Sequence, residues 1–204
     1  MSMEFIRLSV VYVHLIACCV AIGLVLTSDL AIIRQLITGD YASQHDADHI
    51  SSLQSTISKA LIVLWITGAA LIWIDVSAKG LSYFGNPKIQ AKIGMVVLLT
   101  LNGFALHAAV MPALKRVGSL LDLTFSARML AIFSGAVSAV SWFYAAMLGV
   151  GRPLAWKYSL LQLLAAYPFL VAGGFAMMVV LTARARNREM DSTGRFENIL
   201  QSSH

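Results

Sequence analysis

Residues 8–26 read LSVVYVHLIACCVAIGLVL, and this stretch decides the class of fold. A helix needs about 20 apolar residues to cross the hydrocarbon core of a bilayer. Four further stretches, 57–76, 93–114, 129–150 and 158–181, have similar length and composition. The chain is 58% hydrophobic and only 12% charged, about half the charged fraction of a water-soluble domain. We therefore expect an all-α polytopic membrane bundle of five transmembrane helices.

The distribution of basic residues predicts how this bundle is oriented. Residues 1–186 are expected to form the five-helix bundle, and residues 187–204 a flexible cytoplasmic tail. An odd number of helices places the termini on opposite sides of the membrane. More Lys and Arg residues fall on the side of the carboxyl terminus, among them Arg184, Arg186 and Arg188, which favours a cytoplasmic terminus. Charges at membrane edges suit anionic lipid, and they argue against a nucleic-acid partner.

Prolines and charges predict local features of the helices. The first stretch is too long for a cleavable signal peptide, so we expect a retained helix that continues to about residue 38. Lys59 should extend outward from the second helix. Pro87 suits the first turn of the third helix, whereas Pro112 and Pro168 should bend or end their helices.

His14 is the sharpest candidate for a functional residue. It lies about two turns into the first membrane helix, where an ionisable side chain is costly and suggests function. It shares a small, polar helix face with Cys18 and Ala21, which should point into the bundle. The alternative is a neutral imidazole bonded to a hydroxyl or backbone group. Cys18 and Cys19 are adjacent on one helix and cannot bridge each other.

Lys92 should lie near His14 in depth. Counting from Arg7 and from Pro87 places the two residues within a few ångströms of the same level, at 1.5 Å per residue. A His and a Lys at one level on neighbouring helices could hold an anionic or redox group. The alternative for Lys92 is extension to the membrane interface.

Asn102 and His107 lie deeper in the third helix. The levels of His14 and His107 should differ by roughly 12 Å, which makes them poor axial partners for a single haem. They could serve two separate sites. A haem bound by one His and a weaker ligand, such as Met95, Met147 or Lys92, is the other arrangement left open.

A second group of possible metal ligands lies between the first two membrane stretches. On a helical turn, His45 and His49 would stand at positions i and i+4, with carboxylates beside them. This arrangement could bind a divalent metal ion. A solvated cap for the second helix is the alternative.

The fourth membrane stretch carries small residues and aromatic rings. Ala131, Gly135 and Ala139 recur at intervals of four, a spacing that lets helices approach closely. Packing within the monomer explains them, and a homodimer seam is the alternative. Trp142 and Tyr144 could form the wall of a cofactor site or pack in the core.

Several short motifs resemble known bacterial proteins. The segments 12–15 (YVHL) and 67–68 (TG), with Asp29, Arg34 and the string 79–92 (KGLSYFGNPKIQAK), are similar to a family of uncharacterised bacterial polytopic membrane proteins. This resemblance covers about the first 115 residues. More distantly, the layout resembles the HemJ-type protoporphyrinogen oxidases and the CopD-like copper-resistance membrane proteins.

The HemJ-type resemblance implies haem-associated roles for His14 and Lys92. The chain lacks the W-x-G-G-L-F and P-R-L elements that usually follow the first His in the HemJ type. The resemblance therefore implies haem or quinone binding more than oxidation of protoporphyrinogen.

The first functional hypothesis is an integral protein of the bacterial inner membrane that binds b-type haem for redox or electron-transport chemistry. His14 would be an axial ligand, Lys92 would contact a propionate, and the partner would be a membrane redox protein or quinone. The second hypothesis is a small copper-like metal transporter or handling protein, with a path along His14, Cys18, Asn102 and His107. The third is a ligand-free accessory subunit of a membrane complex.

Overall fold

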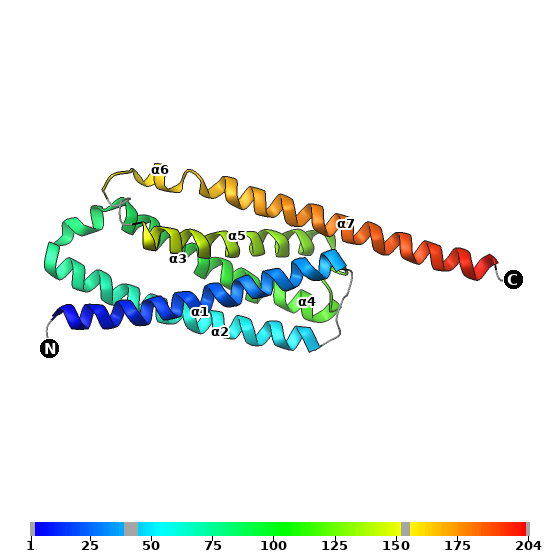
Figure 1. The fold of residues 1–204 in the computed structure, drawn as a ribbon, viewed down its shortest axis with the longest axis horizontal. Coiled ribbons are helices and arrows are strands. Elements are labelled where there is room, and N and C mark those ends of the chain that lie inside the picture. Colours follow the sequence, from blue (N-terminus) through cyan, green and yellow to red (C-terminus); the bar gives the residue numbers. More distant parts are fainter. Residues whose placement is uncertain (1–2, 39–44, 152–155, 203–204) are drawn as a thin grey trace.

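The computed structural model describes residues 3–38, 45–151 and 156–202, and the described residues form helices joined by short turns, with no strand. Figure 1 shows the helices running along one long axis. The elements in chain order are α1 (Met3–Thr38), α2 (His45–Lys79), η1 (Leu81–Gly85), α3 (Pro87–Ala105), η2 (Leu106–Val110), α4 (Met111–Val117), α5 (Phe125–Val150), α6 (Leu160–Leu164) and α7 (Tyr167–Ser202).

Five helical segments in the described part of the chain are long and apolar enough to cross a membrane. They are Met3–Thr38, Ser55–Lys79, Pro87–Val117, Phe125–Val150 and Leu160–Arg188. The first four contain the stretches 8–26, 57–76, 93–114 and 129–150 that the sequence indicated, and the fifth overlaps the stretch 158–181 from residue 160 onward. The expected all-α bundle of five membrane-crossing helices is confirmed, and the chain is a multi-pass membrane protein.

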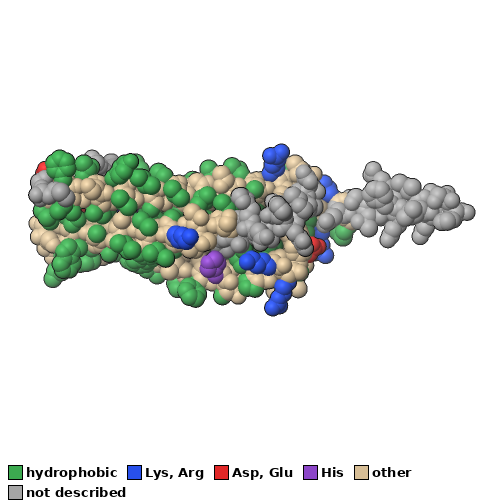
Figure 2. All heavy atoms as spheres, turned by 90° about the horizontal axis from the view of Figure 1, so that it is seen from below, with side chains coloured by type: hydrophobic (Ala, Val, Ile, Leu, Met, Phe, Trp, Pro, Cys, Tyr) green, Lys and Arg blue, Asp and Glu red, His purple; other side chains and the backbone are tan. Residues whose placement is uncertain are grey.

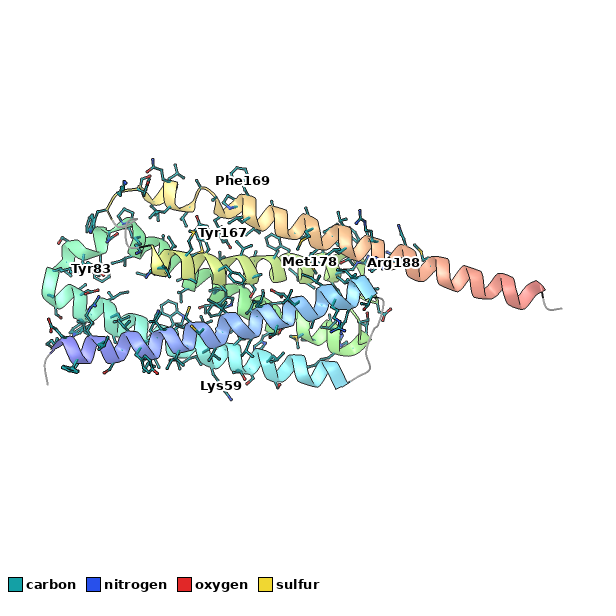
Figure 3. All side chains as sticks on the ribbon, viewed as in Figure 1. Lys59, Tyr83, Tyr167, Phe169, Met178 and Arg188 are labelled. Carbon is teal, nitrogen blue, oxygen red and sulfur yellow. The ribbon has the colours of Figure 1, made fainter. Side chains whose placement is uncertain are left out.

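The outer surface of the bundle is largely apolar. Figure 2 shows hydrophobic side chains over most of one face, with Lys and Arg gathered near the end from which the carboxyl-terminal helix projects. Phe169 and Lys59 both point away from the bundle in Figure 3, and both are exposed. Lys59 extends outward as expected, so its charge does not enter the core.

The helices pack mainly as neighbours around α5. The pairs α1 with α2, α3 with α5, and α5 with α7 have the most extensive contacts. One core cluster joins Ala21 of α1, Leu64 of α2 and Trp142 of α5. A second joins Met95 of α3 to Tyr144 of α5 and to α6. Trp142 and Tyr144 are thus both buried in the core of the bundle.

Each of the three prolines has the local effect that the sequence predicted. Pro87 lies in the first turn of α3, which Asn86 caps by accepting a 3.0 Å bond from the Lys88 amide. Pro112 cannot donate to the carbonyl four residues earlier, and the π-helical turn η2 lies directly before it. Pro168 likewise removes the donor for the carbonyl of Leu164, where α6 ends.

Two helices are longer than expected. α2 begins at His45, so its first turns include residues that the sequence placed in a polar loop. Residues 187–202, which we expected to form a flexible tail, have helical backbone and continue α7. Near the start of this extension, Arg188 donates a 2.6 Å bond to the carbonyl of Ile37 in the last turn of α1. Arg, Glu and Met favour helix, so a polar composition alone does not end α7.

Candidate functional site

Four charged or polar side chains meet at the end of the bundle where α1 begins and α2 ends. Asp75 is at their centre and is only 8% exposed. Its Oδ1 lies 3.4 Å from Arg7 Nε and 3.6 Å from Lys79 Nζ, and its Oδ2 accepts a 2.7 Å bond from the Tyr83 hydroxyl. The Lys79 ammonium also lies 4.7 Å from the centre of the Tyr83 ring. The carboxylate thus joins α1, α2 and η1.

Tyr83 stays protonated in this cluster. Burial raises the pKa of its hydroxyl to about 12, and the bond to Asp75 and the charge of that carboxylate act in the same direction. A neutral hydroxyl is the form that can donate to a carboxylate. Tyr83 therefore remains a hydrogen-bond donor to Asp75 throughout the physiological pH range.

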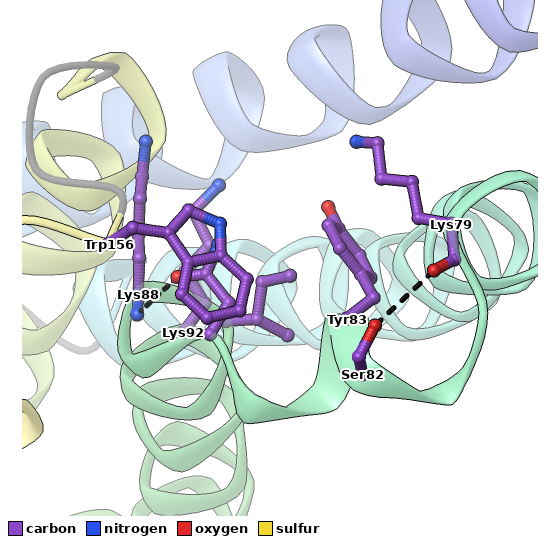
Figure 4. Close-up of a pocket in the computed structure, with 8 residues that line it drawn as sticks. Lys79, Ser82, Tyr83, Lys88, Lys92 and Trp156 are labelled. Atoms are coloured by element: carbon purple, nitrogen blue, oxygen red, sulfur yellow. Dashed lines mark hydrogen bonds between the residues drawn. The ribbon is translucent and has the colours of Figure 1, made fainter.

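Beside this cluster lies a pocket of about 320 Å³ that is open on one side. Figure 4 shows Lys79 and Tyr83 on one side of it and Lys88, Lys92 and Trp156 on the other. None of the described residues that line it is acidic. The pocket is therefore cationic, because it combines three ammonium groups with hydroxyl, amide and indole groups. Its lining consists of Lys79, Ser82, Tyr83, Asn86, Lys88, Ile89, Lys92 and Trp156.

Lys88 and Lys92 differ in how they are held. Lys88 is almost fully buried, and its Nζ donates a 2.7 Å bond to the carbonyl of Gly151 at the end of α5. Lys92 lies one turn deeper on the same face of α3 and is half-buried. Within the described ranges its ammonium makes no hydrogen bond and no ion pair with a carboxylate. Lys92 therefore presents an uncompensated positive charge to the pocket.

His14 is fixed by α2. Its Nδ1 lies 2.7 Å from the hydroxyl of Thr67, and that hydroxyl itself donates a 2.7 Å bond to the carbonyl of Val63. A hydroxyl has a single hydrogen to donate, so Nδ1 of His14 carries the proton and Nε2 keeps a lone pair. The imidazole also lies against Gly68, where an added Cβ would be 3.8 Å from its Cε1.

Three of the residues selected from the sequence come together. Lys92 lies within electrostatic range of both His14 and Cys18, although they belong to different helices. The counting of helical rise led us to expect His14 and Lys92 at a similar level. His14 is not among the residues that line the pocket, so it lies beside the cationic site and does not form its wall.

Asn102 and His107 lie elsewhere. Asn102 is buried and its Nδ2 donates a 3.0 Å bond to the carbonyl of Ser134, which ties α3 to α5. His107 is exposed on the outer surface, within the π-helical turn η2. The structure does not bring these two residues together with His14 and Cys18 in one path.

The remaining candidates fall into two groups. His45 and His49 belong to the first turns of α2, but their side chains lie outside the described part of the structure. Among the residues that the structure does describe, no group of three or more His, Cys, Asp or Glu side chains could hold a metal ion. Cys18 is half-buried, Cys19 is exposed, and both thiols are free.

Part of the small-residue face of α5 packs against α7. Ser134 is fully buried, and a Cβ added at Gly174 of α7 would lie 3.7 Å from the Cβ of Ala136. The Ser141 hydroxyl is 2.8 Å from that of Tyr167, which adds a polar link between α5 and α7. A Cβ added at Gly135 would meet nothing within 4 Å among the described residues. A homodimer seam along Ala131, Gly135 and Ala139 therefore stays a prediction.

The sequence analysis did not identify Asp75, Arg7 or Tyr83 as partners, nor Lys88 and Trp156 as part of a site. A signal was present, because Asp75 ends an apolar run and Tyr83 belongs to the string 79–92 that carried the family resemblance. A charge at the end of a membrane helix is common, and its position in the sequence does not indicate which side chains it contacts.

The described fold and site define a class of protein, a multi-pass α-helical membrane protein with a cationic pocket at one end of its bundle. Comparison of the chain with models of known families, with curated proteins and with solved structures found no match. The function is therefore argued from the site alone.

Proposed function

We propose that this protein binds b-type haem between α1 and α3 and serves haem-associated redox chemistry in the membrane. One observation carries the proposal: the proton on His14 Nδ1 is held by Thr67, which leaves the Nε2 lone pair for a ligand. Histidines that bind metals commonly have the other ring nitrogen fixed in this way. A neutral imidazole is also a common axial ligand of haem iron.

The chemistry of the neighbouring residues fits haem in a second respect. Haem carries two propionates, and Lys92 offers an uncompensated positive charge within electrostatic range of His14. In this proposal Lys92 contacts a propionate and His14 binds the iron. When bound, the haem supplies one-electron chemistry, while the protein binds it, orients it and excludes water.

The proposal commits to a single histidine ligand. His107 is exposed on η2, Met95 lies in the core cluster with Tyr144, and Met147 is exposed. His107 and Met147 are thereby turned toward the outside of the bundle, and Met95 packs against Tyr144, so the proposal assigns the iron to His14 alone. The cationic pocket contains no residue of α1, so haem binding requires α1 and α3 to separate at His14.

A visible absorption spectrum tests this proposal directly. Protein purified from cells supplied with haem should show a Soret band that shifts on reduction with dithionite. His14→Ala should abolish the band, whereas the matched control His107→Ala should keep it, because His107 is exposed on the outer surface. A band that survives in His14→Ala, or a protein with no chromophore, would contradict the proposal. Metal retained without a chromophore would indicate metal handling. A protein with neither metal nor chromophore would indicate a ligand-free accessory subunit.

We also propose that the membrane is the bacterial inner membrane and that the carboxyl terminus is cytoplasmic. Arg184, Arg186 and Arg188 are exposed at the end of the last membrane segment, where positive charge favours the cytoplasmic side. Reporters active on only one side of the membrane, fused after residue 202, should report a cytoplasmic position. Activity of a reporter that works only outside the cytoplasm would reverse this orientation.

A further inference from the structure

We propose that the pocket formed by η1, the first turns of α3 and Trp156 binds the phosphate group of an anionic phospholipid. This inference does not rest on haem binding, because His14 does not line the pocket and the ammonium of Lys92 is assigned here to a lipid phosphate in place of a haem propionate. It assigns a ligand to the cationic pocket itself.

The first argument is charge. Lys79, Lys88 and Lys92 line one small pocket, and none of the described lining residues is acidic. The nearest carboxylate described, on Asp75, already accepts from Arg7 and Tyr83 and lies close to Lys79. Lys88 and Lys92 lie one turn apart on the same face of α3, so their positive charges repel each other and are costly to desolvate. An anion in the pocket beside Lys92 offsets both effects.

The second argument is the position of the pocket along the membrane normal. It lies where the span Ser55–Lys79 ends and the span Pro87–Val117 begins, which is the level of the lipid headgroups. Leu81 and Phe84 of η1 are exposed beside it and can contact acyl chains. A ligand with an anionic head and an apolar remainder fits this place better than a fully water-soluble anion does.

The third argument is the placement of Trp156. Its backbone has φ of 63°, in the left-handed region that non-glycine residues seldom adopt, and it is 63% exposed at the pocket. The indole N–H makes no hydrogen bond with any residue that the structure describes, and the ring lines the pocket. Trp at a membrane interface places its ring among the headgroups, where this donor can reach a phosphate oxygen.

The test uses the full-length protein in a mild detergent, titrated with short-chain phosphatidylglycerol and followed by native mass spectrometry. Phosphatidylglycerol should bind, and Lys92→Met should weaken its binding roughly tenfold, the equivalent of one charge-assisted hydrogen bond. Lys157→Met is the matched control, because Lys157 lies at the same end of the bundle but not in the pocket. This control should bind phosphatidylglycerol as the unaltered protein does.

Two further arms separate the possible ligands. Inorganic phosphate at millimolar concentration should not displace phosphatidylglycerol, and displacement would overturn the lipid assignment in favour of a soluble phosphate compound. If Lys92→Met bound phosphatidylglycerol as tightly as the unaltered protein, the pocket would not be the lipid site. A loss of affinity in Lys157→Met equal to that in Lys92→Met would contradict the assignment in the same way. His14→Ala should abolish any haem band yet leave phosphatidylglycerol binding intact, so the two proposals fail separately. Unchanged elution from a sizing column and an unchanged circular dichroism spectrum establish that each variant is folded.

Discussion

The two ends of the bundle use polar side chains in different ways. At the end that holds the pocket, Asp75 receives groups from α1, α2 and η1, and the side chains face one another. At the opposite end, Arg128 donates to the carbonyl of Leu121 at 3.1 Å, and Arg188 donates to that of Ile37. Those arginines close turns and helix ends. At the pocket end Lys88 likewise donates to a backbone carbonyl, that of Gly151. The two ends therefore differ in Lys92, which among the described residues has neither a carbonyl nor a carboxylate partner and remains available to a ligand.

The largest expected effect on stability is at the opposite end, in Arg128→Ala. Arg128 is buried, so the substitution removes the packing of its alkyl stem and leaves the Leu121 carbonyl without this partner. We expect a loss of about 3 kcal/mol in the free energy of unfolding, measured by denaturant titration in detergent. Phosphatidylglycerol affinity should not change, and the exposed Arg116→Ala serves as the control. If Arg128→Ala lowered the lipid affinity and left the stability unchanged, the proposed difference between the two ends, with structure at one and ligand binding at the other, would be wrong.

The next effect is at Asp75. Asp75→Ala leaves Arg7, Lys79 and Tyr83 without their shared acceptor, and we expect a loss of about 2 kcal/mol. Asp75→Asn should cost less, since its amide oxygen can still accept from Tyr83. Both variants should bind phosphatidylglycerol more tightly, because a negative charge beside the pocket is gone. Weaker binding in Asp75→Asn would mean that the carboxylate positions the lysines for the ligand.

A smaller effect is expected at Thr67. Thr67→Val keeps the shape of the side chain but removes the bond to His14, at a cost of about 1 kcal/mol. Nitrogen chemical shifts of His14 should then show a mixture of the two neutral tautomers in place of a proton fixed on Nδ1. Thr67→Ser retains the hydroxyl and should keep the single tautomer. An unchanged tautomer in Thr67→Val would remove the main support for a ligand at Nε2.

The smallest effect is the pH dependence of Tyr83. Its pKa is raised from 10.0 to about 12 in the folded protein, so folding favours the neutral hydroxyl. The resulting stability is fully present below pH 10 and is lost as the pH rises toward 12. Melting temperatures between pH 9 and about 12 should fall less steeply in Tyr83→Phe than in the unaltered protein. Identical slopes would show that the hydroxyl does not contribute to the Asp75 cluster.

The features that sequence could predict are those governed by local rules. Five apolar stretches gave the five spans, because the hydrocarbon core requires a fixed length of helix. Pro87, Pro112 and Pro168 each mark a helix start or interruption, because proline has no amide hydrogen to donate. Counting the rise per residue also led us to expect His14 and Lys92 at one level, and that expectation stays a prediction.

The features that escaped prediction depend on rotation about the helix axis and on long-range pairing. His107 has a depth that sequence counting can give, but the π-helical turn η2 contains it and its side chain is exposed. Arg7 and Asp75 are 68 positions apart, and no local pattern pairs them. The sequence also does not predict the left-handed backbone conformation of Trp156, since nothing in that residue type requires it.

The extension of α7 sets a distance between the membrane and the last described residues. The apolar run of this helix ends before Arg184, whereas the helix itself continues to Ser202 (Figure 1). At 1.5 Å per residue, the helix from Arg184 to Ser202 is about 27 Å long. Helical backbone therefore holds residue 202 well clear of the headgroups. A flexible tether of the same length would instead let that residue return to the lipid surface.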